Sequence, residues 1–359
     1  MQPIGSFKIR GATYKISQLT AAERKKGVVA ASAGNHAQGV AWGSKKLGVK
    51  ALIVMPKSAP LVKIKNTESL GAEIVLEGDN YDEAFQAAQK IAKKTGRAYV
   101  HAFDDEQVIA GQGTLALELL EQLPDVDVVI GSVGGGGLMS GVATVMKELR
   151  PQAKIYGAQA SGCPAMLKSI QAGRPVNVEY SDTFADGIAV KVTKELPFKI
   201  LSEKLDGILQ ADDESIAEAI LTLLEKAKVV SEAAAAVSLA VLEQIRKRIA
   251  GKKVVVIIGG GNIDVNVLNR VIDRGLIKKG RRLRANVLIS DRTGSLARLT
   301  STIALAGANV IQAIHDRSEP STTIDRTEVQ LTLETRGPEH SAEVLKALRS
   351  TVLDLHVIS

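Results

Sequence analysis

Several kinds of residue are scarce in this chain, and each scarcity excludes a class of protein. The single cysteine, Cys163, leaves no internal disulfide and suits a reducing compartment. Aromatic residues make up 3% of the 359 residues, too few for the stacking platforms that single-stranded nucleic acid requires, so we expect no nucleic-acid partner. The sequence has no apolar run of about 18 residues and no leading signal peptide, so we expect a cytoplasmic protein without membrane contact.

Metal-ligand patterns and excess acidic charge are also missing. No two of the five histidines have the spacing typical of metal ligands, so we predict no metal site. The formal net charge is +7, and much of it lies in the basic run 278–284 around Gly280, which predicts a solvated linker. A positive balance also suits an anionic cofactor and amino-acid carboxylates.

The residues that are plentiful favour an α/β fold. From residue 28 to about 275, short apolar runs alternate with longer helical patterns, which predicts a mainly parallel sheet covered by helices on both faces. Ligands of such sheets bind outside the carboxyl ends of the strands. We expect strands at 28–31, 51–55, 73–76, 98–101, 126–130, 155–160 and 254–258.

The pattern changes after the basic run. Expected strands and helices follow in the order βαββαβ, which is a ferredoxin-like module. We therefore predict two domains, residues 1–279 and residues 280–359.

Lys8 is the first candidate for chemistry. It follows Phe7, lies between Gly5 and Gly11, and precedes a helical pattern that begins near Ala12. A lysine presented into a pocket in this way can lose its proton and form an imine with a carbonyl. Taken alone, the segment also fits a solvated lysine near a helix start.

Three glycine-containing stretches follow expected strands. Residues 32–36 (Ser-Ala-Gly-Asn-His) open a helix whose N-terminus favours an anion such as a carboxylate, although an ordinary cap by Ser32 or Asn35 fits equally. Residues 134–138 (four glycines and a leucine) form a nest of N–H groups suited to phosphate, or a flexible turn. They match neither the nucleoside-triphosphate loop nor the dinucleotide spacing. Residues 259–262 allow backbone to approach a flat ligand, or make a turn.

A reactive lysine, a phosphate cradle and an anion-binding helix start together suggest pyridoxal phosphate. Here the chain resembles the fold-type II (tryptophan-synthase-β-like) pyridoxal phosphate family, and within it the threonine dehydratases, also called threonine ammonia-lyases. The resemblance covers residues 1 to about 275, and residues 285–359 resemble an ACT regulatory domain. The motifs that carry it lie at 5–12, 32–39, 110–114, 133–138, 185–187, 259–264 and, for the ACT domain, 291–296.

The resemblance implies a role for each candidate residue. Lys8 holds the cofactor and removes the Cα proton, Phe7 packs against the cofactor ring, and Asn35 bonds its phenolic oxygen. The backbone of Gly134, Gly135, Gly136, Gly137 and Leu138 binds the phosphate. The substrate carboxylate is held by Ser32, Ala33, Gly34, Asn35 and His36.

The implied reaction converts L-threonine to 2-oxobutanoate and ammonia. L-Serine would give pyruvate as a side activity, because one methyl group is worth only about 1–3 kcal/mol of discrimination. The resemblance also implies a homo-oligomer with isoleucine or valine as an effector, bound near the turn at Arg292-Thr293-Gly294.

Two other functions stay open. An amino-acid racemase of the same family needs a second acid/base, but that branch has a serine where this chain has Ala33. The racemase branch also has a divalent-cation site, and the aligned positions here are Gln159 and Ala165, which lack carboxylates. The third reading is a non-catalytic amino-acid sensor.

The chain departs from the family at two places. Most dehydratases place a hydroxyl or thiol against the pyridine nitrogen, at the position that is Gly259 here. Family members also have a helix and a strand ahead of the lysine motif, whereas only residues 1–4 precede it here. We expect either a start further upstream or a shortened chain with an exposed sheet edge.

Overall fold

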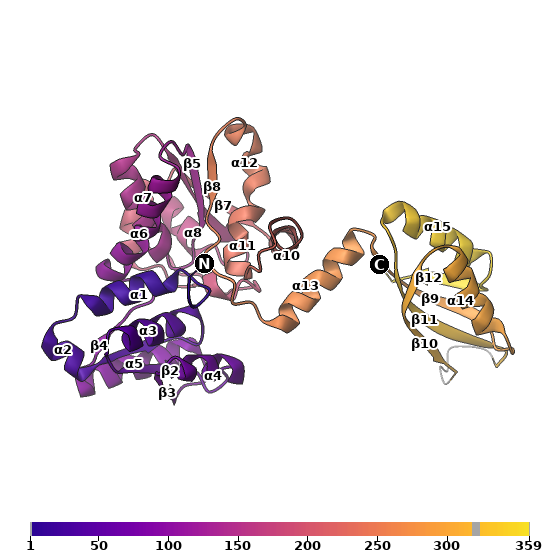
Figure 1. The fold of residues 1–359 in the computed structure, drawn as a ribbon, viewed down its shortest axis with the longest axis horizontal. Helices are drawn as coiled ribbons and strands as arrows, with labels where there is room; N and C mark the ends of the chain where they lie inside the picture. Colours follow the sequence, from indigo (N-terminus) through magenta and orange to yellow (C-terminus); the bar gives the residue numbers. More distant parts are fainter. Residues whose placement is uncertain (1, 318–323, 359) are drawn as a thin grey trace. The chain divides into compact units, whose positions relative to one another are not determined.

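The computed structural model describes residues 2–317 and 324–358. The chain divides into two compact units, and the boundary in the sequence lies between Ile263 and Asp264. Figure 1 shows both units. Among the described residues, no helix is long and apolar enough to cross a bilayer.

The first unit contains two four-stranded parallel sheets, with strand orders β3-β2-β1-β4 and β7-β6-β5-β8. The expected parallel series is therefore divided between two sheets. The strands are β1 (Val28–Ala31), β2 (Ala51–Met55), β3 (Glu73–Leu76), β4 (Ala98–Tyr99), β5 (Val128–Ser132), β6 (Lys154–Ala160), β7 (Gly207–Ala211) and β8 (Val254–Val256).

Helices connect these strands and cover the sheets. They are α1 (Lys8–Ser17), α2 (Ala21–Lys26), α3 (Asn35–Lys46), α4 (Leu61–Ser69), α5 (Tyr81–Thr95), α6 (Glu106–Gln122), α7 (Gly137–Leu149), α8 (Ala165–Ala172), α9 (Glu195–Lys204), α10 (Asp213–Thr222), α11 (Ala233–Ala240) and α12 (Leu242–Ile249). A short 3-10 helix, η1, spans Asp186–Ile188, and a π-helical turn, η2, spans Leu223–Ala227.

The strand β1 is apolar throughout because both of its faces are covered. Val28 and Ala30 join the hydrophobic cluster that contains residues of α1 and α3, whereas Val29 and Ala31 join the cluster that contains α5. Successive side chains of a strand point to opposite faces, so a sheet covered on both sides requires apolar residues at every position.

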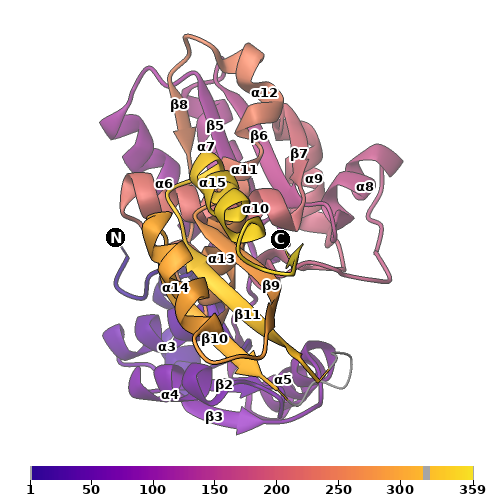
Figure 2. The same ribbon diagram turned by 90° about the vertical axis from the view of Figure 1, so that its right-hand side faces the viewer.

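The second unit begins with α13 (Val265–Lys278) and continues in the predicted βαββαβ order. Its elements are β9 (Arg282–Ser290), α14 (Ser295–Leu305), β10 (Asn309–Asp316), β11 (Arg326–Glu334), α15 (Pro338–Arg349) and β12 (Asp354–Val357). The sheet is antiparallel, in the order β10-β11-β9-β12. Figure 2 shows α14 and α15 together on one face of this sheet, where β9 and β11 bury every second residue.

The structure differs from the sequence expectation around residue 280. We expected the basic run to be a solvated linker, and this was wrong: Arg282 and Arg284 lie on β9, and both guanidinium groups bind the carboxylate of Asp273 on α13. These contacts attach α13 to the second unit, so this unit begins at Asp264, ahead of the predicted position at 280.

A second expectation concerned the start of the lysine helix. We placed it near Ala12, but α1 begins at Lys8, with Phe7 as its N-cap residue. Gly11 therefore lies inside the helix and not ahead of it. It packs closely on α6, where a side chain would have no room.

Candidate active site

The candidate residues meet in one pocket of the first unit. Asn35 follows β1, Phe103 follows β4, Gly134 follows β5 and Gly259 follows β8, so the pocket lies at the carboxyl ends of the strands as expected. The lining residues are Phe7, Lys8, Asn35, Phe103, Ser132, Gly134, Gly135, Gly136, Gly137, Leu138, Gly187, Ile188, Glu232, Ala234, Ala235 and Gly259.

Lys8 presents its amine inside this pocket. Its Nζ donates a hydrogen bond to the carbonyl oxygen of Ala102 at 3.0 Å and lies 5.2 Å from the centroid of the Phe7 ring. Burial lowers the pKa of Lys8 from 10.5 to about 8, and the Glu232 carboxylate opposes this change. The amine is therefore suited to exchange a proton near neutral pH.

The segment ahead of Lys8 is held by the third glycine stretch. The N–H of Phe7 donates to the carbonyl of Gly259, and the N–H of Gly261 donates to the carbonyl of Gly5, both at 2.9 Å. An antiparallel bridge between Ser6 and Gly260 lies between these two bonds. Residues 259–261 thus form the backbone partner of the lysine segment.

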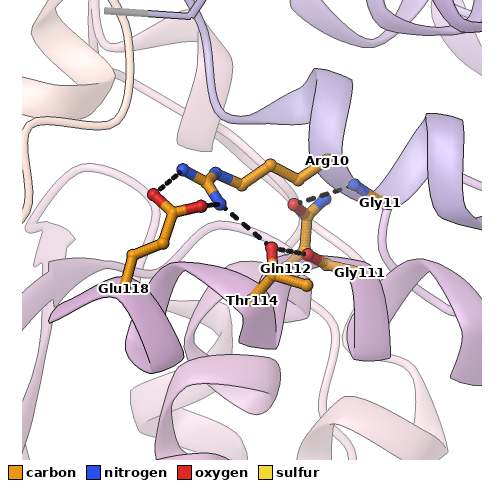
Figure 3. A network of polar contacts seen from close by, with 6 residues as sticks. All are labelled: Arg10, Gly11, Gly111, Gln112, Thr114 and Glu118. Atoms are coloured by element: carbon orange, nitrogen blue, oxygen red, sulfur yellow. Dashed lines mark hydrogen bonds and ion pairs between the residues drawn. The ribbon is translucent and has the colours of Figure 1, made fainter. Parts of the chain in front are cut away.

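An ion pair fixes α1 against α6 (Figure 3). The guanidinium of Arg10 makes two hydrogen bonds to the carboxylate of Glu118, at 2.6 and 2.7 Å, and a third to the hydroxyl of Thr114 at 3.0 Å. The paired geometry orients the helix as well as attracting it. Since Arg10 lies two residues after Lys8 on α1, this contact helps to define where Lys8 points.

The same two helices approach closely through glycines. The N–H of Gly11 donates to Oε1 of the buried Gln112 at 3.2 Å (Figure 3). A Cβ at Gly111 would lie 2.7 Å from the Cα of Gly11, which no real side chain tolerates. Motif 110–114 therefore packs the lysine helix, and none of its residues lines the pocket.

The tetraglycine forms a tight bend between β5 and α7. Gly136 has φ of 92°, a left-handed conformation that glycine adopts without strain. A Cβ at Gly134 would lie 2.8 Å from the Cα of Ile188, and one at Gly137 would lie 2.8 Å from the Cα of Phe103. Side chains would therefore fill this end of the pocket, and glycines leave the backbone N–H groups free to approach a ligand.

Glu232 brings a buried carboxylate into the pocket. Its side chain is 8% exposed, and both carboxylate oxygens accept from Nδ2 of Asn35 at 2.9 Å. Burial raises the pKa of Glu232, and the hydrogen bond from Asn35 opposes this effect. The amide and the carboxylate thus form one polar unit beside Lys8.

The predicted substrate-binding stretch is only partly in the pocket. Asn35 lines it, whereas Ser32, Ala33, Gly34 and His36 are not among its lining residues. Ser32 accepts from the N–H of Gly34 through its hydroxyl at 3.1 Å. His36 is buried, its Nε2 lies 2.8 Å from the carbonyl oxygen of Val100, and burial lowers its pKa to about 3, so the ring is neutral. The contact of these residues with substrate stays a prediction.

Sequence reasoning missed several residues of the pocket. Phe103 is fixed by His101, whose Nδ1 accepts the N–H groups of Phe103 at 3.2 Å and Asp104 at 2.8 Å and whose ring packs edge-on against the phenyl ring. For Glu232, one signal was present: an acidic residue directly ahead of the apolar helix α11. The other missed residues are Ser132, Ile188, Ala234 and Ala235, which carry no such signal, whereas Gly187 belongs to the predicted motif 185–187.

The two positions that we expected to correspond to the racemase cation site carry no carboxylate. Gln159 is fully buried, and its Oε1 accepts the N–H of Leu167 on α8 at 3.1 Å, while Ala165 begins that helix. Within residues 2–317 and 324–358, no cluster of three or more His, Cys, Asp or Glu side chains could hold a metal ion.

Comparisons with known proteins identify the family. A model of the family described as "Pyridoxal-phosphate dependent enzyme" matches residues 1–260. The chain belongs to this family. An L-threonine ammonia-lyase of Thermotoga maritima is 47% identical over 359 residues, which is 100% of this chain and 89% of that protein.

Two solved structures have a fold similar to that of this chain. The processed form of threonine deaminase isoform 2 from Solanum lycopersicum has a TM-score of 0.74 and 39% identity, covering 76% of this chain and 80% of that one. Maize serine racemase has a TM-score of 0.72 and 32% identity, covering 77% of this chain and 85% of that one.

The residues of the pocket fit pyridoxal phosphate, the cofactor of the family. Lys8 supplies an amine of lowered pKa for the aldehyde, and glycines replace side chains that would occupy the phosphate end. Asn35 supplies an amide donor, and Phe7 supplies a flat apolar surface. Gly259 also lines the pocket but carries no hydroxyl, as its sequence implied.

Proposed function

We propose that this protein is a threonine ammonia-lyase that converts L-threonine to 2-oxobutanoate and ammonia, with L-serine to pyruvate as a side activity. The observation that carries the proposal is the amine of Lys8, with its pKa lowered to about 8, in a pocket shared with the tetraglycine bend and Asn35. The 47% identity to an L-threonine ammonia-lyase over the whole chain supports it.

The residues of the pocket would divide the work of holding the cofactor. The N–H groups of residues 134–138 would hold the phosphate, Asn35 would donate to the ring oxygen, and Phe7 would pack on the ring. When bound, pyridoxal phosphate supplies an electron sink for the negative charge that develops at the substrate Cα.

The protein's own groups then handle the proton. The Nζ of Lys8 takes the proton from Cα, and its lowered pKa lets it do so without a large energetic cost. The carbonyl of Ala102 holds this nitrogen in place at 3.0 Å. Loss of the β-hydroxyl and hydrolysis of the remaining C–N bond give 2-oxobutanoate and ammonia, with no oxidant or reductant required.

Racemisation is the second candidate, favoured by the 32% identity to maize serine racemase. It requires a second acid/base opposite Lys8, and Ala33 at that position is an apolar residue packed against the core of the first sheet. Ala33 has no proton to give, which supports elimination. A non-catalytic sensor would have no need of the lowered lysine pKa.

The deciding experiment measures keto acids and D-serine together. Wild-type protein loaded with pyridoxal phosphate is expected to form 2-oxobutanoate from L-threonine faster than pyruvate from L-serine, and Lys8→Ala is expected to form neither. The exposed Lys94→Ala is the matched control and should behave as wild type. D-Serine as the main product would support the racemase, and no product at all would support the sensor.

We also propose that the second unit, predicted as an ACT regulatory domain at 280–359, regulates a cytoplasmic homo-oligomer through isoleucine or valine. Its βαββαβ order supports this, as does the turn at Arg292-Thr293-Gly294 between β9 and α14, where Gly294 has φ of 87°. Either amino acid should shift the dependence of rate on threonine. If neither does, the effector assignment is wrong.

A further inference from the structure

A chain of hydrogen bonds passes through two residues of the pocket, Asn35 and Glu232, and has a defined direction. Nδ2 of Asn262 donates to the carbonyl oxygen of Ile4 at 3.3 Å and also to Oδ1 of Asn35. Nδ2 of Asn35 in turn donates to both carboxylate oxygens of Glu232 at 2.9 Å. Two side-chain amides thus lie between a backbone carbonyl and a carboxylate.

The two ends decide which way each amide points. A carbonyl oxygen and a carboxylate oxygen both accept hydrogen bonds. If the amide of Asn35 turned over, its oxygen would face the carboxylate of Glu232 and its NH₂ would face the NH₂ of Asn262. Both contacts would be repulsive, so Asn35 must direct its NH₂ toward Glu232.

Glu232 is the buried anchor of this chain. It is 8% exposed, whereas Asn262 lies at the exposed end. The N–H of Glu232 donates to the carbonyl of Gly260 at 3.1 Å, and a Cβ on Gly260 would collide with the Glu232 carboxylate. The absence of a side chain at Gly260 therefore leaves the space that the carboxylate occupies.

We propose that Glu232 is a positioning residue that orients the amide of Asn35, so that its NH₂ and not its oxygen faces the cofactor ring. This rests on the proposed function in one respect, the binding of pyridoxal phosphate beside Lys8. Because the amide is held from both sides, it already has one orientation before the ligand binds. This preorganisation lowers the conformational-entropy cost of binding. The role is exerted through Asn35 and needs no contact between Glu232 and the substrate.

The test is a double-mutant cycle on cofactor affinity, measured by equilibrium dialysis of apoprotein against pyridoxal phosphate. Asn35→Ala and Glu232→Leu are each expected to weaken binding by about tenfold, the scale of one lost hydrogen bond to a charged group. Because Glu232 acts through Asn35, the double variant is expected to bind no more than about twofold worse than Asn35→Ala alone. The exposed Glu243→Leu on α12 is the control and should bind as wild type.

Glu232→Gln separates orientation from charge, since it keeps an acceptor oxygen for Asn35 but removes the negative charge. It is expected to stay within about threefold of wild type, because one acceptor suffices for one hydrogen bond. A Gln variant as weak as Asn35→Ala, or losses that multiply in the double variant, would overturn the proposal. If Glu232→Leu does not fold, the affinity of Glu232→Gln alone decides whether Glu232 orients Asn35.

The proposed function and the role of Glu232 are contradicted by different results. Wild-type protein that does not bind pyridoxal phosphate, or binds it and forms no 2-oxobutanoate, contradicts the proposed function. If the wild type is active but the affinity losses of Asn35→Ala and Glu232→Leu multiply in the double variant, only the role of Glu232 is contradicted.

Discussion

At the scale of single residues, two opposing effects set the charge of Lys8. Removal of water from the amine favours the neutral form and lowers the pKa to about 8, while the nearby Glu232 carboxylate favours the charged form. An enzyme that needs the amine as a proton acceptor benefits from this setting, although the folded apoprotein is destabilised by it.

The destabilisation of the folded apoprotein by the buried amine of Lys8 depends on pH in a defined way. Between pH 8 and 10.5 unfolded chains bind more protons at Lys8 than folded ones, so the contribution of Lys8 to stability rises with pH. Lys8→Met lacks this rise. The stability of the apo variant relative to wild type is therefore expected to fall by about 2 kcal/mol between pH 7 and pH 10, at about 1.4 kcal/mol per pKa unit.

Urea unfolding of both apoproteins across this pH range measures the effect. The exposed Lys94→Met should follow wild type in parallel. Parallel curves for Lys8→Met would mean that the amine is not desolvated in the folded apoprotein.

Single residues also show which parts of the site a sequence reveals. Asn35 and Gly134 were predictable because glycines and short polar residues follow apolar strands where a ligand must approach the backbone, and Lys8 because its motif places it between glycines at a helix start. Glu232 was not, because an acidic residue ahead of an apolar helix is a weak signal and its partner Asn35 is far along the chain. A contact between residues about 200 positions apart leaves no local pattern.

At the scale of elements, the lysine helix depends on glycine contacts with α6. Gly111→Ala places a methyl group 2.7 Å from the Cα of Gly11 and 2.8 Å from the carbonyl of Arg10. Overpacking of this kind is expected to lower the free energy of unfolding by about 1–3 kcal/mol. Affinity for pyridoxal phosphate should fall as well, because α1 begins at Lys8.

Urea unfolding and dialysis against the cofactor measure the two effects. Glu121→Ala, an exposed position on the same helix, is the control and should change neither. Normal cofactor affinity in Gly111→Ala would show that α1 keeps its place without this contact.

Elements with strong patterns were predicted well. The expected strands at 28–31, 51–55 and 73–76 match β1, β2 and β3 residue for residue. The strand β7 was missed because most of its residues are only partly buried and its sequence mixes apolar and polar side chains. The division into two sheets was also missed, since the pairing of parallel strands depends on contacts between distant segments.

At the scale of the whole molecule, α13 decides where the second unit begins. Its amphipathic pattern resembles the preceding helices, so sequence alone assigned it to the first domain. The carboxylate of Asp273 on α13 binds Arg282 and Arg284 on β9, and these side chains are largely buried or half-buried. These ion pairs join residues 9 and 11 positions apart, and composition gives no sign of which charged residues will pair.

A fragment that starts at residue 264 is therefore expected to unfold at higher urea concentration than one that starts at 280. Within the longer fragment, Asp273→Ala should lower the free energy of unfolding by about 1–3 kcal/mol, the range for hydrogen bonds to charged groups left without a partner. The exposed Asn269→Ala on the same helix should have no effect. Equal stability of the two fragments would place the boundary back near 280.

The central claim is that Lys8 carries the cofactor, and chemical reduction tests it most directly. Borohydride makes the bond between pyridoxal phosphate and its lysine permanent, and trypsin does not cleave after a modified lysine. Mass spectrometry of the digested holoprotein is expected to show the cofactor on the N-terminal peptide that continues through Lys8 to Arg10. The cofactor on any other lysine, or on none, would contradict the account.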